Sequence, residues 1–301
     1  MHMGIREAAV RTIVLPYGVD HYATIYFLGD WHVGSKRFAA QRFATYRRRI
    51  QQDPNAYWVG MGDYADLITT TDPRAMLDMY EPGMYTPEAL ADPGAYQADR
   101  VIEEAEPMAD KCLGLLPGNH ETKYKKHNLR RWFANEIGPA LRDLAPEAYR
   151  ERFILDYEDW LILRFIREGQ DPKAGTASCV CWLYHGSGGG QLKGAKALRQ
   201  QRRAWRHSVA HLIVTAHAHE SLAFPEVGYE VDRRTGRVVS RKVQTLLAGS
   251  FKLRGGWEVE KELNEQVPGT GYARLYPWRT LTQDGVRVSG FSHPDSVVLE
   301  Q

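Results

Sequence analysis

The sequence predicts an α/β fold, because apolar, β-rich segments alternate along the chain with segments of helical periodicity. Five of the apolar segments are each followed directly by Asp, Asn or His. These polar stretches are Asp30-Trp31-His32, Gly62-Asp63, Gly118-Asn119-His120, His185-Gly186 and His217-Ala218-His219. Oxygen and imidazole ligands from five separate strand ends suit a pair of divalent metal ions.

The first half of the chain supports this class element by element. The elements predicted in order are strands at 11–15 and 23–28, an amphipathic helix at 36–52, a strand at 57–61, a helix at 96–109, a strand at 111–116 and a helix at 123–144 with a break at Gly138-Pro139. Residues 67–95 are rich in Pro, Gly, Met and Tyr and show weak periodicity. We interpret this segment as an insertion that forms a lid.

The second half continues the alternation. The elements predicted in order are a strand pair at 153–157 and 161–167, a strand at 178–184, a helix at 192–208, a strand at 211–215, a hairpin of 227–232 with 237–247 across residues 233–236, and a strand within 286–298. No internal repeat or clear linker divides the chain. We therefore expect a single domain over 1–301, with a β-rich C-terminal part at 222–301.

Composition excludes several classes of protein. The 301 residues are 43% hydrophobic and 25% charged, as in an ordinary soluble domain. The formal net charge of +2 does not by itself indicate a nucleic-acid partner. No apolar run approaches the roughly 18 residues that span a membrane, and the N-terminus lacks a secretory pattern. We therefore expect that the protein does not enter a membrane. Three cysteines do not form a disulfide framework, so we also expect a cytoplasmic protein.

The polar stretches favour a metal site because of their spacing. Asp30 and His32 are two residues apart, as are His217 and His219, so each pair can point to one side of an extended segment. A single Asp-X-His would more often be a surface pair. Five such stretches, each after an apolar strand, favour a metal centre instead.

The order Asp-X-His, Gly-Asp, Gly-Asn-His-Glu, His-Gly and X-His-X-His resembles the calcineurin-like metallophosphoesterases, including uncharacterised members from bacteria and phages. The resemblance covers residues 30–219. It implies a four-layer α/β/β/α sandwich of two mixed sheets flanked by helices. It also implies two metal ions, one held by Asp30, His32, Asp63 and His219 and the other by Asp63, Asn119, His185 and His217, with Asp63 bridging them.

The resemblance also implies the chemistry. Two divalent cations roughly 3.5–4 Å apart generate a bridging hydroxide that attacks phosphorus and polarise the phosphoryl oxygens. His120 is not needed as a ligand, so it can protonate the leaving oxygen. Asp66, in the pattern Gly62-Asp63-Tyr64-Ala65-Asp66, would orient His120; the alternative is that Asp66 caps the following segment.

Two departures from the family pattern matter. The last motif begins after Ala216 rather than after glycine, which adds one methyl group beside the metal loop. Leu67 and Ile68 come after Asp66, where phosphoserine and phosphothreonine phosphatases of this family usually carry Arg and Gly. The second departure weighs against a protein phosphatase.

The segment after His185 is the best guide to the substrate. Its glycine-rich turn includes Gly188 and Gly189, whose backbone can approach a phosphate closely. The next helix contains Lys193, Lys196, Arg199, Arg202, Arg203 and Arg206, with no acid among them. We expect Lys193, Lys196 and Arg199 to bind substrate, and Leu198, Trp205 and Val209 to pack inward. The alternative is a solvated basic face that is paired with acids elsewhere.

These observations predict a two-metal phosphoesterase that hydrolyses phosphodiester bonds of nucleotides or nucleic acids, a nuclease-like hydrolase. The alternatives are a phosphomonoesterase for proteins or small metabolites, and a nucleic-acid-binding protein with structural metals. Manganese is the expected ion, with nickel, iron, zinc and cobalt as alternatives. The expected partner is a phosphorylated substrate, with DNA, RNA and nucleotides left open. The sequence does not indicate an oligomeric state.

Overall fold

The structure, a computed structural model, describes residues 7–18, 20–68, 72, 79–123, 133–171, 177–187, 193–255, 259, 267–278, 281–283, 286–288 and 297–299. Helices and strands alternate through these residues, so the predicted α/β class is confirmed. The strands are β1 (Ala9–Leu15), β2 (Ala23–Leu28), β3 (Ala56–Gly60), β4 (Cys112–Leu115), β5 (Glu158–Arg167), β6 (Ala177–Tyr184), β7 (Leu212–Thr215), β8 (Ser221–Val231), β9 (Val238–Ser250), β10 (Gly269–Leu275), β11 (Leu281–Gln283), β12 (Val286–Val288) and β13 (Val297–Leu299).

A large mixed sheet organises the described part of the chain. Its main path runs β1-β5-β6-β7-β9-β10-β2-β3-β4, with β8 paired to β9 and β13 paired to β10. Strands β2, β3 and β4 are mutually parallel, and so are β6, β7 and β9. The two parts of the sheet join where β9 pairs with β10 over only two residue pairs. Strands β11 and β12 form a separate two-stranded ladder.

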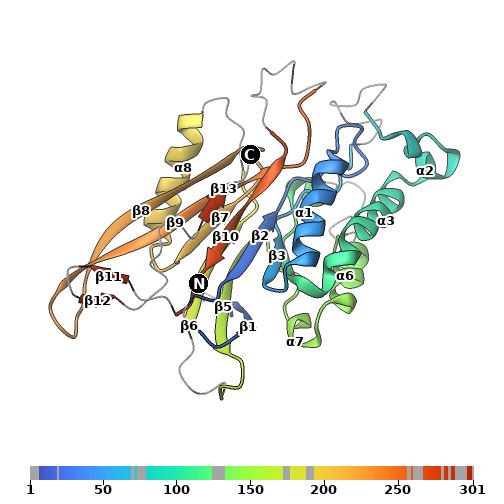
Figure 1. The fold of residues 1–301 in the computed structure, drawn as a ribbon. Coiled ribbons are helices and arrows are strands. Elements are labelled where there is room, and N and C mark those ends of the chain that lie inside the picture. The colour runs from blue at the N-terminus through green and yellow to red at the C-terminus, as the bar shows by residue number, and fades with distance from the viewer. Residues whose placement is uncertain are drawn as a thin grey trace, which may run out of the picture.

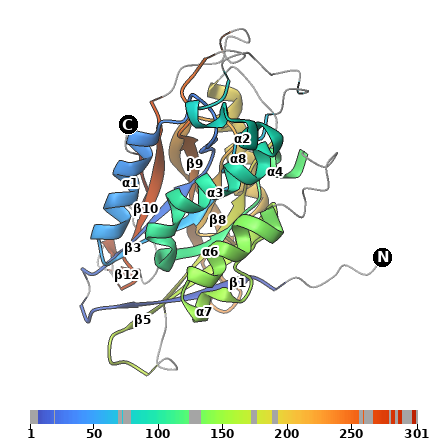
Figure 2. The same ribbon diagram turned by 90° about the vertical axis from the view of Figure 1, so that its right-hand side faces the viewer.

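Helices lie on two opposite sides of the strands, as Figure 1 shows. The helical segments are η1 (Pro82–Met84), α2 (Pro87–Ala91), α3 (Pro93–Ala105), η2 (Glu106–Lys111), α4 (Asn119–Lys123), the π-helix η4 (Phe133–Ile137), α6 (Gly138–Leu144), α7 (Glu147–Arg150), α8 (Lys193–Arg206) and α1 (Ala40–Gln52). Helices α1, α3 and α6 lie together on one side of the strands, and α8 lies on the other (Figures 1 and 2).

The buried side chains form three clusters that match this arrangement. One cluster joins α1, α3 and α6 to β2 and β3, and includes Phe43, Val101 and Trp58. A second cluster consists largely of strand residues from both parts of the sheet, such as Ile25 of β2 with Leu161 of β5. The third lies beneath α8 and contains Ala204. The core therefore has apolar contacts on both faces of the strands.

Local sequence explains where α1 begins and ends. Phe43, Tyr46 and Ile50 recur at helical spacing and are fully buried, which fixes the inward face. The helix begins at Ala40, four residues later than predicted, because Phe38 forms a β-bridge with Lys252 and its N–H bonds to Ser35. It ends where Asp53 turns extended just before Pro54.

The hairpin of β8 and β9 is confirmed, and both strands are longer than predicted. The strands pair in antiparallel register from Ser221 with Ala248 to Val231 with Val238. The predicted strand pair at 153–157 and 161–167 was wrong. Residues 153–157 contribute only a bridge from Ile154 to Leu115, and β5 pairs with β1 and β6 instead. The apolar run at 161–167 correctly predicted a strand, but the sequence pattern could not predict which strands pair with it.

The inward face predicted for the basic helix was also wrong. Leu198, Trp205 and Val209 on α8 and just after it are 62%, 65% and 60% exposed. The buried positions are Gln200 and Ala204, and Lys196 and Arg203 are half-buried beside them. Helix α8 thus turns a polar and basic side toward the sheet.

Within the described residues, none of the helices combines the length and the apolar character that crossing a bilayer requires. The predicted insertion at 67–95 includes η1, α2 and the start of α3. The N–H of Glu81 bonds to Gly34, and the backbone of Tyr80 pairs with Ser35, so residues 80 and 81 pack beside the loop after His32. Whether this segment acts as a lid stays a prediction, and residues 69–71 and 73–78 lie outside the described part.

Candidate metal centre

All seven predicted ligands lie just after the carboxyl ends of parallel strands. Asp30 and His32 come after β2, Asp63 after β3, and Asn119 begins α4 after β4. The remaining ligands, His185, His217 and His219, come after β6 and β7. Parallel strands bring these ends to one edge of the sheet. The two parts of the sheet are linked there, because the N–H of His217 donates to Asp30 Oδ2 at 2.8 Å.

The side chains gather into three groups, and within each group the ligand atoms all lie within 4.8 Å of one another. The groups are Asp30 with His32 and His219, Asp63 with His185 and His217, and His32 with Asp66 and His120. The first two match the two ligand sets that the resemblance implied, except for Asp63 in the first set and Asn119 in the second. Asn119 lies beside the second group, with Oδ1 3.1 Å from Nε2 of His185. The bridging role of Asp63 stays a prediction.

The backbone is left-handed at most of these ligands. Seven described non-glycine residues have a positive φ, and five of them are predicted ligands: Asp30, His32, Asp63, His217 and His219, with φ between 51° and 69°. This conformation is uncommon for residues with a Cβ and clusters at functional sites. It turns each side chain abruptly off the strand end and toward the shared edge.

Glycines allow the ligand loops to approach each other closely. Gly62 has φ +92°, and a Cβ there would lie 2.5 Å from the backbone nitrogen of Gly118. A Cβ at Gly118 would lie 2.1 Å from the backbone nitrogen of Asp63. The departure at Ala216 is also accommodated, because its methyl group faces Gly29, where a Cβ would lie 3.0 Å away.

The imidazole of His32 is held by a buried carboxylate. Its Nδ1 donates to Asp66 Oδ1 at 2.9 Å, and Lys252 Nζ donates to the same oxygen at 3.0 Å. Burial, and after it the charge of Lys252, lower the pKa of His32 to about 3 against the opposing hydrogen bond to Asp66. Burial would raise the pKa of Asp66, but Lys252 and His32 hold it well below its usual range. Neutral imidazole with Nδ1 fixed by a carboxylate presents Nε2 to a metal.

His185 is oriented in a similar way by the backbone. Its Nδ1 donates to the carbonyl oxygen of Met61 at 2.6 Å, and its Nε2 lies 3.3 Å from Asp63 Oδ2. Burial opposes the charged imidazole, but the Asp63 carboxylate outweighs it and raises the pKa of His185 to about 9. His217, in the same group, has its pKa lowered to about 4 by burial. In this group the Asp63 carboxylate therefore lies beside one imidazole that binds a proton readily, His185, and one that does not, His217.

Glu121 is a buried residue of the candidate site that the sequence analysis did not single out. It is 1% exposed, and its carboxylate accepts the N–H groups of Gly118 at 2.7 Å, Asp63 at 2.9 Å and Tyr64 at 2.7 Å. Burial, and after it repulsion from Asp63, raises its pKa to about 7. Glu121 thus joins the loops after β3 and β4. It could have been found, because it completes the sequence Gly-Asn-His-Glu.

His120 and Asp66 lie together, but their contact differs from the predicted one. Nδ1 of His120 donates to the backbone carbonyl oxygen of Asp66. The carboxylate of Asp66 bonds instead to His32 and Lys252. The backbone N–H of His120 donates to Asp63 Oδ1 at 2.8 Å. Nothing in the pattern around Lys252 marked this lysine as part of the site.

The first ligand group contains a buried oxygen atom without a hydrogen-bond partner, which a bound cation would satisfy. Asp30 Oδ1 is buried without a hydrogen-bond partner, and it lies 3.3 Å from Nε2 of His219. Nε2 of His219 and Nε2 of His32 are 3.1 Å apart, although Nδ1 of His32 already carries the proton that Asp66 accepts. A carboxylate oxygen and two imidazole nitrogens that face one another are suitable donors for a first-row divalent metal.

The predicted substrate residues are only partly described. Lys196 Nζ donates to the carbonyl oxygen of Ala218 at 3.3 Å and pairs with Glu220 at 2.8 Å, which places it beside the His217–His219 loop. Arg199 donates to the carbonyl oxygen of Ser187 at 3.2 Å. Gly188 and Gly189 lie outside the described residues, and the side chain of Lys193 is likewise not described.

Known proteins similar to this chain are found among solved structures, at low sequence identity. No protein-family model matches the chain, and no curated protein matches it. Solved structures that it matches include a conserved uncharacterised protein, a predicted phosphoesterase, from Streptococcus pneumoniae, at 11% identity and TM-score 0.29, covering 85% of this chain and 83% of that one. A single mutant of Vps29 from Entamoeba histolytica matches at 11% identity and TM-score 0.28, covering 84% and 87%.

A third match is GAP50, the anchor in the inner membrane complex of Plasmodium, at 9% identity and TM-score 0.40, covering 93% of this chain and 90% of that one. All three TM-scores are below 0.5. The resemblance to calcineurin-like metallophosphoesterases rests on the five motifs, whose residues the structure brings to one edge of the sheet.

Proposed function

We propose that this chain is a calcineurin-like phosphodiesterase that hydrolyses phosphodiester bonds of nucleotides or nucleic acids with two divalent metal ions. The observation that carries the proposal is the pair of buried ligand groups, Asp30 with His32 and His219, and Asp63 with His185 and His217. Both groups combine carboxylate and imidazole donors, which suits manganese, iron, zinc, nickel or cobalt. Manganese is the ion that we would test first.

The two groups would hold one ion each, with Asn119 as a further donor to the second. Bound there, two cations would lower the pKa of water and polarise the phosphoryl oxygens of a substrate. The protein supplies the positions of the donors. Asp66 and the carbonyl oxygen of Met61 fix the imidazoles of His32 and His185, and Glu121 fixes the backbone on either side of Asp63.

His120 is the proposed general acid. Its Nδ1–H donates to the backbone carbonyl oxygen of Asp66, so Nε2 is the ring atom that would give a proton to the leaving oxygen. The ring also packs edge-on against His32, at 4.7 Å between ring centroids, which places it beside the first ligand group. The sequence predicted that the Asp66 carboxylate orients His120. In this proposal the backbone carbonyl group of Asp66 orients it instead.

The preference for diesters over monoesters is supported by the two residues after Asp66. Leu67 and Ile68 are 5% and 6% exposed, so apolar side chains are buried where related protein phosphatases usually carry an arginine. A phosphomonoester carries more negative charge than a diester and gains more from such a cation. The absence of an arginine at positions 67 and 68 therefore favours a diester substrate.

The larger architecture is part of the proposal. The strand-rich core cluster joins side chains from both parts of the sheet, and helices lie outside on both sides. This supports two sheets that face each other as the inner layers of the four-layer sandwich.

The experiment compares two chromogenic substrates with manganese-loaded protein. We expect hydrolysis of bis-p-nitrophenyl phosphate to exceed that of p-nitrophenyl phosphate. His120→Ala should lower kcat for the diester by about 10²–10⁴-fold, since it removes a general acid. Asp63→Asn should reduce activity together with bound metal measured by elemental analysis. His21→Ala, outside the site, is the matched control.

Three results would overturn parts of this proposal. Unchanged activity in both site variants would remove the mechanism. A preference for p-nitrophenyl phosphate would favour the phosphomonoesterase. Salt-sensitive binding of DNA or RNA without turnover under any metal would favour a nucleic-acid-binding protein with structural metals.

A further inference from the structure

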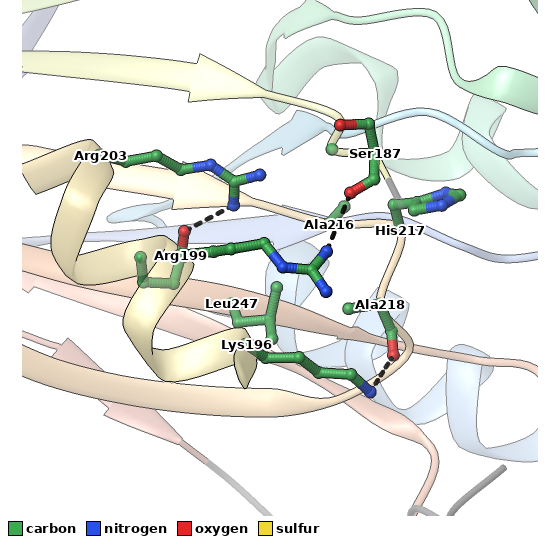
Figure 3. Close-up of a pocket in the computed structure, with 10 residues that line it drawn as sticks. Ser187, Lys196, Arg199, Arg203, Ala216, His217, Ala218 and Leu247 are labelled. Atoms are coloured by element: carbon green, nitrogen blue, oxygen red, sulfur yellow. Dashed lines mark hydrogen bonds between the residues drawn. The ribbon is translucent and has the colours of Figure 1, made fainter. Parts of the chain in front are cut away.

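A basic pocket opens directly beside the second ligand group. About 270 Å³ of space not filled by protein atoms, open solvent included, lies there between α8 and the residues just after β6 and β7. Side chains of Lys196, Arg199 and Arg203 enter it from α8, and His217 lines its far wall, as Figure 3 shows. Because His217 also belongs to the second ligand group, the pocket is adjacent to that group.

Arg203 is the cation in this pocket whose contacts are all with neutral groups. Its Nη1 donates to Gln200 Oε1 at 2.8 Å and to Thr215 Oγ1 at 3.4 Å, and its guanidinium lies 5.1 Å from the ring centroid of Tyr184. Burial lowers the pKa of Arg203, with a weaker opposing effect from Glu158. The Glu158 carboxylate instead accepts from Trp182 Nε1 at 3.2 Å. A partly buried charge without a counter-ion is costly, and an anion in the pocket would offset that cost.

The two other cations of the pocket, Lys196 and Arg199, both contact backbone carbonyl groups. Lys196 is paired with Glu220 and donates to the backbone of Ala218, so its charge is largely compensated. Arg199 reaches across to the carbonyl oxygen of Ser187. The residues that line the pocket therefore include three cationic side chains and no carboxylate.

We propose that this pocket is an anion subsite that binds a second phosphate group of the substrate while the scissile diester lies at the metal centre. The inference rests on the proposed function and deepens it. The substrate class becomes a nucleotide or short oligonucleotide with at least two phosphate groups, since a substrate with one phosphate leaves Arg203 unpaired. An arginine guanidinium suits phosphate because it can donate two parallel hydrogen bonds.

The test uses three substrates that share the same scissile diester: thymidylyl-thymidine, its 5′-phosphorylated form and its 3′-phosphorylated form. We expect manganese-loaded wild-type protein to prefer one of the phosphorylated forms by at least about tenfold in kcat/KM, the size of a charge-assisted hydrogen bond. Arg203→Gln should bring the ratio of phosphorylated to unphosphorylated substrate close to one. Arg203→Lys, which keeps the charge, should retain part of the preference.

The matched control is Arg202→Gln. Arg202 lies next to Arg203 in sequence but on the exposed side of α8, so this variant removes the same charge outside the pocket and should keep the wild-type ratio. Arg199→Gln provides a second pocket variant if Arg203→Gln lowers the melting temperature. An equal loss of preference in Arg202→Gln would point to general charge and overturn the subsite.

The outcomes separate this inference from the proposed function. Hydrolysis of all three dinucleotides without preference would leave the function standing and overturn the subsite. If none is hydrolysed, the function fails, and the subsite is judged by inorganic phosphate alone. In that case a phosphate-dependent rise in the melting temperature of metal-free protein that is lost in Arg203→Gln supports an anion site, and its absence overturns it.

Discussion

Glu121 shows how one buried carboxylate can fix the backbone of the candidate metal centre without being one of its candidate ligands. Its two oxygens accept N–H groups from residues on both sides of the gap between β3 and β4. Neither Asp63 nor Asn119 could hold its position if these backbone groups separated. The side chain therefore acts on the ligands through the backbone.

Replacing Glu121 with Gln should destabilise the protein and weaken metal binding together. The amide keeps one acceptor oxygen but turns an NH₂ group toward backbone N–H donors, which leaves buried donors unsatisfied at about 1–3 kcal/mol. Urea unfolding and metal titration of the same preparation measure the two effects. Glu151→Gln, at an exposed position, should change neither. Wild-type metal affinity in Glu121→Gln would contradict this account.

The buried histidines predict the acid sensitivity of metal-free protein. The pKa of His32 is lowered from 6.5 to about 3, and that of His217 to about 4. Between its lowered pKa and 6.5, each of these histidines binds more protons in the unfolded chain than in the folded chain. The free energy of unfolding therefore decreases as the pH falls below 6.5. Glu121, whose pKa is raised to about 7, acts in the opposite direction between its ordinary 4.5 and 7.

Comparing wild type with His32→Asn isolates the histidine contribution. Urea unfolding of chelator-treated protein from pH 7 down to about pH 4 should show a shallower loss of stability in the variant. His21→Asn, outside the site, should retain the wild-type slope. Parallel slopes for wild type and His32→Asn would show that His32 does not carry the effect.

At the scale of elements, helix α8 is the clearest case in which the apolar periodicity of the sequence predicted the wrong buried face. Its apolar residues Leu198 and Trp205 share a helical face, and that pattern normally marks the buried side. The structure buries Gln200 and Ala204 instead, because the strand ends beneath α8 offer polar partners: Gln200 donates to the carbonyl oxygen of Leu246, and Lys196 to that of Ala218. Periodicity identifies a face, but only the neighbouring elements decide which face is buried.

Two substitutions on α8 should therefore behave differently from what the sequence suggests. Trp205→Gln, at an exposed position, should alter the free energy of unfolding by no more than about 0.5 kcal/mol. Ala204→Leu, at a position only 2% exposed, should cost about 1–3 kcal/mol through overpacking. Urea denaturation of both variants provides the measurement. A large loss for Trp205→Gln would restore the inward face that the sequence predicted.

The strand ends were far more predictable than the helix faces. Each of the five motifs comes within a few residues of a strand end, because an apolar run ended by Gly-Asp, Gly-Asn or His-Gly carries both its length and its stop signal locally. Contacts such as Lys252 with Asp66 join residues 186 positions apart, and no local pattern encodes them. The strand-end positions of the candidate ligands could thus be predicted, whereas the contact of Lys252 with Asp66 could not.

At the scale of the whole molecule, bound metal should stabilise the entire fold. The two parts of the sheet share only two residue pairs between β9 and β10, and Asp30 and His217 join them at the site. A ligand that binds only the folded chain stabilises it by about 2.7 kcal/mol at one hundred times its dissociation constant. We expect chelation to lower the melting temperature and manganese to restore it, with magnesium less effective because it prefers oxygen donors. An unchanged melting temperature after complete metal removal would contradict this.

The left-handed backbone at five ligand positions bears on the history of the chain. Each such residue costs stability that glycine would not, of the order of 1 kcal/mol per position. Random substitution under selection for folding alone would replace these residues, since proteins readily accept changes that relieve strain. Asp30, His32, Asp63, His217 and His219 nevertheless combine this backbone with side chains that could hold a metal ion. Backbone strain that gathers at one edge of a fold is typical of a functional site, and it costs stability that folding alone does not require.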